Sequence, residues 1–278
     1  MVYFISESGD DEYEEEAADI GGPLREFLTI ATETISKGTA PQLFEGNDDH
    51  KLPVHNQQLV LNGYFKMTGE IMAHAIVHGD VWFAGMAKAV KVYLSTGCAE
   101  TAAQVVCPED VPDMNVRQVL QRMSQAGEDE VASLNREDLV SNLLDESGVS
   151  APYVTVNNAA QVTYEIMVHQ VIHKRLRELD EIRKGLNVLQ LGTLLSVHPK
   201  VTSLVFPTLD EVAVDLHVLV ARVKQDPTSC QSEKSDTAFG YFREYLQNVF
   251  KRKEGRYQTW CTVCTFYLGH FLLRLFPL

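Results

Sequence analysis

Apolar residues recur at helical spacing along most of this chain, and the longest such stretch runs from Asn62 to Leu94. Its first half carries a stripe on one side of a helix, made of Phe65, Met72, Ala73 and Ile76. Gly79 and Asp80 interrupt this stripe, as residues that tolerate the left-handed region do at a helix end. A second stripe follows, made of Phe83, Met86, Ala87, Val90 and Leu94. The pattern predicts two apolar helices joined by a tight turn and packed against each other at the centre of a domain.

The segment before this pair combines a short strand, an acidic run and a helix. Residues 2–5 are apolar and are expected to form a strand. Seven of the ten residues from Asp10 to Asp19 are Asp or Glu, so self-repulsion predicts a solvated loop there, with a binding segment for a basic partner as the alternative. Gly21-Gly22-Pro23 then favours a helix start, and the helix is predicted to close at Gly38.

The middle of the chain predicts shorter elements. Helices are expected at Val116–Met123 and Arg136–Leu144, with the acidic residues 128–130 separating them. Residues 154–156 are interpreted as a brief strand or as an extended lead-in to Asn157 and Asn158, which are good helix caps.

One long helix is predicted after these caps, running without a break to Gly185. Its stripe holds helical spacing over more than six turns and consists of Val162, Ile166, Ile172, Leu176, Leu179, Ile182 and Leu186. Thr208 and Glu211 fit a capping box before another apolar stripe, made of Leu209, Val212, Ala213, Leu216 and Val220. A polar linker is expected at 224–236, and a last amphipathic helix at 239–250.

Composition limits the possible functions. Of the 278 residues 22% are charged and 45% are hydrophobic, which is typical of a globular protein. The net charge of -14 argues against a general nucleic-acid binder, because phosphate binding needs a clustered basic surface. The five cysteines are irregularly spaced and no signal peptide is recognised, so reduced thiols in the cytoplasm or nucleus are expected.

Candidate metal and nucleophile motifs are few. Cys261 and Cys264 form a Cys-x-x-Cys pair without a second Cys or His pair nearby, so ordinary thiols are favoured over a zinc or redox site. His169 and His173 have the spacing of a zinc-protease helix, but Gln170 stands where the general base would be. His74 and His78 repeat that spacing, and His78 can simply offset a helix dipole. No metal, cofactor or catalytic residue is predicted.

The last stretch, from Trp260 to Leu278, is almost entirely apolar and close to the length of a membrane span. Arg274 and His270 argue against insertion, since a mid-membrane Arg costs about 2.5–3.5 kcal/mol. Membrane anchoring is therefore the less favoured alternative. The composition changes abruptly after Gly255, and we interpret the tail as belonging to a truncated or alternatively spliced product.

Several short motifs follow one another in a particular order. They are GGPLREF from Gly21 to Phe27, Leu43-Phe44-Glu45, GYFKMTGEIMAHAIVHG with Phe65, Gly69, Ala75 and Gly79, Val156-Asn157-Asn158, and Gly185-Leu186. In this order they resemble the HECT domain of ubiquitin ligases, with similarity over roughly residues 1 to 250.

The resemblance implies a mostly helical α+β fold like the N-lobe of that family. It would comprise residues 1–223, followed by the linker 224–236, a helix at 237–255 that resembles the start of the C-lobe, and a divergent tail at 256–278. The implied function is transfer of ubiquitin to a protein substrate through a cysteine thioester, with a ubiquitin-conjugating enzyme and ubiquitin as partners.

Departures from the family pattern qualify this expectation. The acidic run is inserted near the first motif, and the subdomain that docks the conjugating enzyme, between about Val111 and Val156, is shortened. After Glu254 the resemblance stops, and Cys261 and Cys264 only faintly echo the family's Thr-Cys step. We therefore expect this chain to lack the catalytic cysteine. The alternative is a non-enzymatic helical interaction module, or a decoy that binds conjugating enzymes.

Overall fold

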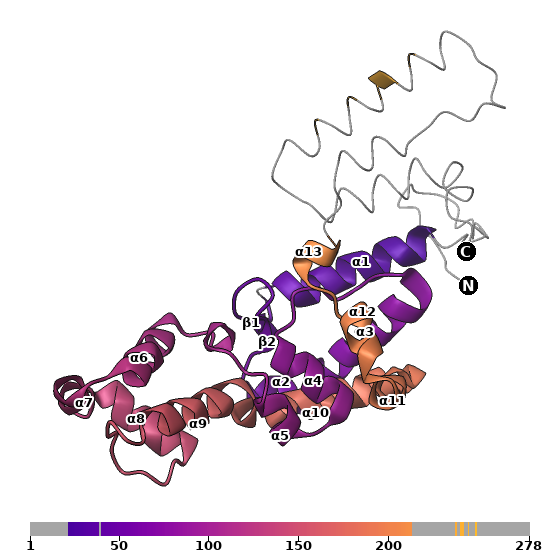
Figure 1. Ribbon diagram of the computed structural model, residues 1–278. Coiled ribbons are helices and arrows are strands. Elements are labelled where there is room, and N and C mark those ends of the chain that lie inside the picture. The colour runs from indigo at the N-terminus through magenta and orange to yellow at the C-terminus, as the bar shows by residue number, and fades with distance from the viewer. Residues whose placement is uncertain are drawn as a thin grey trace. The chain divides into compact units, whose positions relative to one another are not determined.

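The computed structural model describes residues 22–38 and 40–212, together with residues 237, 240, 241, 244 and 248 (Figure 1). The chain divides into two compact units, of which one is Ala31–Leu209 and the other combines Met1–Ile30 with Asp210–Leu278. Nearly all described residues belong to the unit Ala31–Leu209, and the fold is given below for that unit.

Helices make up most of the described chain, in agreement with the predicted mostly helical α+β class. They are α1 Gly22–Lys37, α2 Gln57–Leu61, α3 Tyr64–Gly79, α4 Lys88–Thr96, α5 Ala99–Ala103, α6 Met114–Gln125, α7 Glu128–Leu134, α8 Asp138–Ser147, α9 Ala159–Val171, α10 Leu176–Leu186, α11 Leu191–Val197, α12 Thr202–Val205 and α13 Leu209–Val212. Short 3-10 turns lie at η1 Pro108–Asp110, η2 His173–Arg175, η3 Asn187–Leu189 and η4 Pro199–Val201. Within the described residues the sheet has two antiparallel strands, β1 Phe44–Glu45 and β2 Leu52–Pro53, which pair Phe44 with Pro53 and Glu45 with Leu52.

The centre of the unit is the contact between α3 and α10. Gly69 of α3 and Gly185 of α10 meet where the helices cross, and a Cβ atom on Gly69 would lie 2.9 Å from the Gly185 Cα and overlap the carbonyl oxygen of Ile182. The absence of both side chains therefore lets the two backbones touch. Phe65 and Met72 on α3 and Ile182 on α10 are fully or almost fully buried beside this crossing.

The predicted tight turn between the two central helices is wrong. The first helix does end at Gly79, with Asp80 in the left-handed region at φ 48°, but α4 begins only at Lys88. The intervening backbone pairs with Lys51, whose N–H donates to the Gly85 carbonyl and whose carbonyl accepts from the Ala87 N–H, each at 3.0 Å. Phe83, Met86 and Ala87 are buried as expected, but in a non-helical connection, and α3 packs mainly on α10 and not on α4.

The predicted long helix is also broken, into α9, η2 and α10. Six of the seven stripe residues are buried and Leu176 is partly buried, so their assignment to the core is confirmed. The step from Ile166 to Ile172 is not a whole number of helical turns, and it coincides with the end of α9 at Val171. The break places Arg175 inside the protein, where its guanidinium donates to the Gln170 carbonyl at the end of α9.

Helices α6, α7 and α8 lie together at one end of this unit, next to α9 (Figure 1). Two of them correspond to the predicted helices at 116–123 and 136–144. The acidic residues expected to separate these helices instead form the first turn of α7. Three carboxylates at a helix N-terminus are favourable because they face the positive end of the helix dipole.

Residues 154–156 form no strand: Val154 and Thr155 have no regular structure, and Val156 begins a turn that leads into α9. The Asn135 side chain takes the place of a strand partner: its Nδ2 donates to the Val154 carbonyl and its Oδ1 accepts from the Val154 N–H, both at 2.8 Å. A single side-chain amide thus satisfies both backbone groups of a buried residue.

Several predicted segments lie outside the described residues. These are the strand at 2–5, the acidic run at 10–19, the linker at 224–236 and the tail at 256–278. Of the helix expected at 237–255, the described residues 237, 240, 241, 244 and 248 are helical.

Candidate functional site

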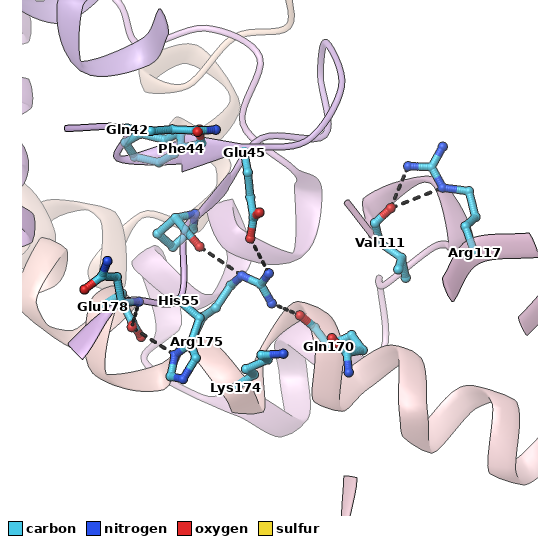
Figure 2. A network of polar contacts seen from close by, with 12 residues as sticks. Gln42, Phe44, Glu45, His55, Val111, Arg117, Gln170, Lys174, Arg175 and Glu178 are labelled. Atoms are coloured by element: carbon cyan, nitrogen blue, oxygen red, sulfur yellow. Dashed lines mark hydrogen bonds and ion pairs between the residues drawn. The ribbon is translucent and has the colours of Figure 1, made fainter. Parts of the chain in front are cut away.

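A buried arginine joins the small sheet to the junction between α9 and α10. Arg175 in η2 is 3% exposed, and its Nε donates to the Pro53 carbonyl at 2.9 Å (Figure 2). One terminal nitrogen donates to the Gln170 carbonyl at the end of α9, and the other pairs with the Glu45 carboxylate at 2.5 Å. The fork geometry of a guanidinium suits three acceptors in fixed directions. This network is a structural clamp, since the guanidinium is buried and each of its three sides has an acceptor from a different segment.

A second buried charge lies close to this clamp. Glu178 of α10 is 1% exposed, and its Oε1 accepts from the Asn56 N–H at 3.0 Å and lies 3.1 Å from the His55 Nδ1 (Figure 2). The other carboxylate oxygen has no hydrogen-bond partner among the described residues. Because Asn56 is the N-cap of α2, Glu178 fixes the start of that helix.

Three side chains with metal-ligand chemistry meet where the loop between β1 and β2 approaches η1. The Nδ1 of His50 lies 2.7 Å from Oδ1 of Asp110, and the Sγ of Cys107 lies 4.0 Å from the same nitrogen. The ligand atoms of the three residues all lie within 4.8 Å of one another. Within the described residues, these three side chains are close enough to one another to bind a single metal ion together.

The backbone around this cluster is held from several sides. The second oxygen of Asp110 accepts from the Cys107 N–H at 3.1 Å, which closes the turn η1. Arg117 of α6 then caps the end of η1, because its guanidinium donates to the Glu109 carbonyl at 3.0 Å. It also donates to the Val111 carbonyl at 2.6 Å (Figure 2). On the other side, the His50 N–H donates to the Asn47 carbonyl at 3.0 Å.

The thiol in this cluster is protonated at neutral pH. Burial, and then the Asp110 charge and hydrogen bonds to Glu109 and Asp110, raise the pKa of Cys107 from 9.0 to about 12. A thiolate is the nucleophilic form, so the free Cys107 is a poor nucleophile. Among the described residues the other partly buried thiol, Cys98, donates a hydrogen bond to the Glu100 carboxylate, with 3.0 Å between sulfur and oxygen.

The residues singled out from the sequence are placed differently. His169 and His173 fall on either side of the end of α9, with ring centroids 6.5 Å apart in an edge-to-face arrangement. Between them, Gln170 donates to Glu146 of α8 at 3.0 Å, and burial lowers the pKa of His169. His74 and His78 stack at 5.4 Å. Cys261 and Cys264 lie outside the described residues.

Sequence reasoning missed the cluster of His50, Cys107 and Asp110. Cys107 and Asp110 are three residues apart, but the third member lies 57 positions before Cys107, and the two segments share no recognised motif. The spacing from Cys107 to Asp110 is the only local signal, and by itself it is too common to indicate a site.

An exposed apolar surface lies on the lead-in to α9. Tyr153 is 58% exposed and Val156 is 50% exposed, while Val154 between them is buried and held by Asn135. The two hydrogen bonds to Asn135 fix the backbone of Val154, and thereby the positions from which the Tyr153 and Val156 side chains project. Both side chains are therefore accessible to a partner from a backbone whose position is fixed.

Within the part of the chain that the structure describes, every helix is too short or too polar to cross a membrane. Comparison of the chain with protein-family models, with curated proteins and with solved structures found no match.

Proposed function

We propose that residues 31–209 form a docking module of the ubiquitin-conjugation pathway that resembles the N-lobe of a HECT-type ubiquitin ligase and binds ubiquitin-conjugating enzymes. The observation that carries the proposal is the contact between Gly69 and Gly185. Each glycine belongs to a different motif of the family resemblance, and the motifs are more than a hundred residues apart in the chain. A fold built on that family's pattern requires such motif residues to occupy restricted packing positions.

Other motif residues support the same proposal. Phe65 and Ala75 are fully buried and Gly79 is buried, and with Gly69 they make up the helix pattern of the resemblance. Glu45, from the Leu-Phe-Glu motif, forms the ion pair with Arg175 at the break before α10. Gly69, Gly185 and Glu45 all belong to motifs of the resemblance, and each of them makes a contact between segments that are far apart in the chain.

The docking surface is assigned to the end of the unit formed by α6, α7 and α8. The family resemblance puts the subdomain that contacts the conjugating enzyme between about Val111 and Val156. Tyr153 and Val156 are the exposed apolar side chains nearest to its C-terminal limit, and Asn135 holds the backbone between them. Hot spots of interfaces are enriched in such anchored aromatic residues.

Binding of purified conjugating enzymes to the full chain tests this assignment. Immobilised chain is titrated with a panel of conjugating enzymes, and Tyr153→Ser and Val156→Ser are expected to weaken binding at least tenfold, or about 1.4 kcal/mol. Leu204→Ser is the matched control, because Leu204 is an exposed apolar residue on α12, outside the proposed surface. The proposal fails if no enzyme of the panel binds, or if the control weakens binding as much as Tyr153→Ser.

A second assay separates an acceptor of ubiquitin from a docking module or decoy. The chain is mixed with activating enzyme, conjugating enzyme and ubiquitin, and any adduct that dithiothreitol releases is mapped by mass spectrometry. The raised pKa of Cys107 leaves little thiolate to attack, so formation of a thioester on that residue is slow. We expect no adduct on Cys98 or Cys107. Docking without any adduct would support the module or decoy, whereas an adduct on Cys261 or Cys264 lost in the alanine variant would assign the transfer chemistry to the tail.

A further inference from the structure

We propose that His50, Cys107 and Asp110 bind one divalent transition-metal ion of the zinc class, through an imidazole nitrogen, a thiolate sulfur and a carboxylate oxygen. The three side chains come from two segments that the fold brings together, and their ligand atoms lie within 4.8 Å of one another. This inference is independent of the proposed docking of conjugating enzymes.

The spacing of the ligand atoms is close to what a tetrahedral ion needs. With usual bond lengths of about 2.0–2.3 Å, a tetrahedral zinc site separates nitrogen and oxygen ligands by about 3.3 Å, and nitrogen and sulfur ligands by about 3.6 Å. The corresponding distances are 2.7 Å between His50 Nδ1 and Asp110 Oδ1, and 4.0 Å between His50 Nδ1 and Cys107 Sγ. The contact of His50 with Asp110 must therefore open by about 0.6 Å and its contact with Cys107 must shorten by about 0.4 Å, and a rotation of the His50 ring moves its nitrogen in both of these directions.

The ligands are held before an ion arrives. Asp110 is 1% exposed, and Arg117 holds the backbone on both sides of it by donating to the carbonyls of Glu109 and Val111. The Asp110 carboxylate and the Cys107 thiol therefore have little freedom to move. The His50 side chain is 30% exposed and gives the ion a route from solvent. Rigid ligands on one side and an accessible ligand on the other are favourable for binding, because little conformational entropy is lost.

The donor set selects the kind of ion. A thiolate and an imidazole are poor ligands for Mg²⁺ and Ca²⁺, which prefer oxygen, and good ligands for Zn²⁺ and Co²⁺. On binding, the neutral His50 ring carries its proton on Nε2, Cys107 releases its thiol proton to solvent, and Asp110 binds as a carboxylate. The two ligand charges then neutralise the ion. Water or the neighbouring Glu109 carboxylate completes the fourth position.

Cobalt(II) is the probe for this site, because a cobalt–thiolate bond gives a charge-transfer absorption in the near ultraviolet. The purified full chain, stripped of metal with a chelator, is titrated with Co²⁺ and then with Zn²⁺. We expect one equivalent of Co²⁺ to produce the band and Zn²⁺ to remove it. Cys107→Ser should abolish the band, and His50→Gln should weaken Co²⁺ binding at least about tenfold, since even outer-shell partners contribute that much.

Cys98→Ser is the matched control, because Cys98 is the other described cysteine and is also partly buried. It should leave the band and the affinity unchanged. His50→Gln keeps a donor for Asp110 and so preserves the fold if Cys107→Ser does not, with circular dichroism as the check. Absence of a thiolate band in the wild-type chain, or a band that survives both Cys107→Ser and His50→Gln, would overturn the proposal and leave a simple hydrogen bond between His50 and Asp110.

Discussion

Gly69 on α3 and Gly185 on α10 pack back to back, and a Cβ atom on either glycine would approach the other's Cα to within 2.9 Å or less. The neighbouring atoms are backbone atoms of the opposite helix, so they cannot rotate away as a side chain can. The crossing of the two helices therefore depends on the absence of two side chains.

Gly69→Ala and Gly185→Ala are each expected to lower the free energy of unfolding by about 1–3 kcal/mol or more, because the added methyl group forces the helices apart. Urea denaturation of the full chain measures the change. Gly127→Ala is the control, since a Cβ at that position meets no atom within 4 Å. If the control is as destabilising as the two crossing variants, close helix contact is not the cause.

Replacing Arg175 tests the buried clamp between the sheet and α10. Arg175→Met should lower the free energy of unfolding by about 3 kcal/mol, near the lower end for a broken buried ion pair, because Glu45 is partly exposed and can be hydrated. Arg175→Lys should recover only part of this loss, since an ammonium group lacks the fork that reaches three acceptors.

The control for the clamp is Arg122→Met. Arg122 bonds to Glu130 and Glu137 at 2.7 and 2.8 Å, but the Arg122 side chain is 42% exposed whereas Arg175 is 3% exposed, so little change in stability is expected. Equal effects of the Arg122 and Arg175 variants would contradict the importance of burial. Urea denaturation at a single pH is sufficient for the comparison.

Asn135 should be important for the exposed surface that precedes α9. Asn135→Ala leaves the buried Val154 N–H and carbonyl without partners, and a loss of about 1–3 kcal/mol is expected. Asn135→Asp can accept from the N–H but cannot donate to the carbonyl, and should restore only part of the stability. Asn115→Ala, at an exposed position of α6, is the control. Unchanged stability of Asn135→Ala would show that water replaces the amide without cost.

Cys107 should react slowly with alkylating agents while the chain is folded. Burial raises its pKa to about 12, so at pH 8 the folded chain holds much less thiolate than the unfolded chain, in which the pKa is near 9. Alkylation by iodoacetamide, followed by peptide mass spectrometry in a chelator, should be at least about tenfold slower in the folded chain than in urea.

The same pKa shift makes stability depend on pH at the alkaline end. The folded pKa of Cys107 is raised, so its contribution is complete below about pH 9 and is lost as the pH rises toward 12. Cys107→Ala should flatten the stability curve in that window and leave it unchanged near neutral pH. If the stability of Cys107→Ala fell more steeply with pH than that of the wild-type chain, burial would not be disfavouring the Cys107 thiolate.

Local spacing in the sequence was enough to predict helices and core residues. The first described helix ends at Lys37, next to the predicted Gly38, and the stripes placed Phe65, Met72, Leu179 and Ile182 in the core, where they lie. These features depend on residues a few positions apart on one helix face, so a single stretch of sequence contains the information.

Only the tertiary structure decided where helices break and which polar groups meet. The break before α10 depends on Arg175 reaching Pro53 and Glu45, both more than a hundred residues earlier, and the connection after Gly79 depends on pairing with Lys51. The cluster of His50, Cys107 and Asp110 likewise joins two distant segments. Because a buried polar group must find a partner wherever the fold supplies one, such contacts follow from the packing of the whole unit and leave no periodic trace in the sequence.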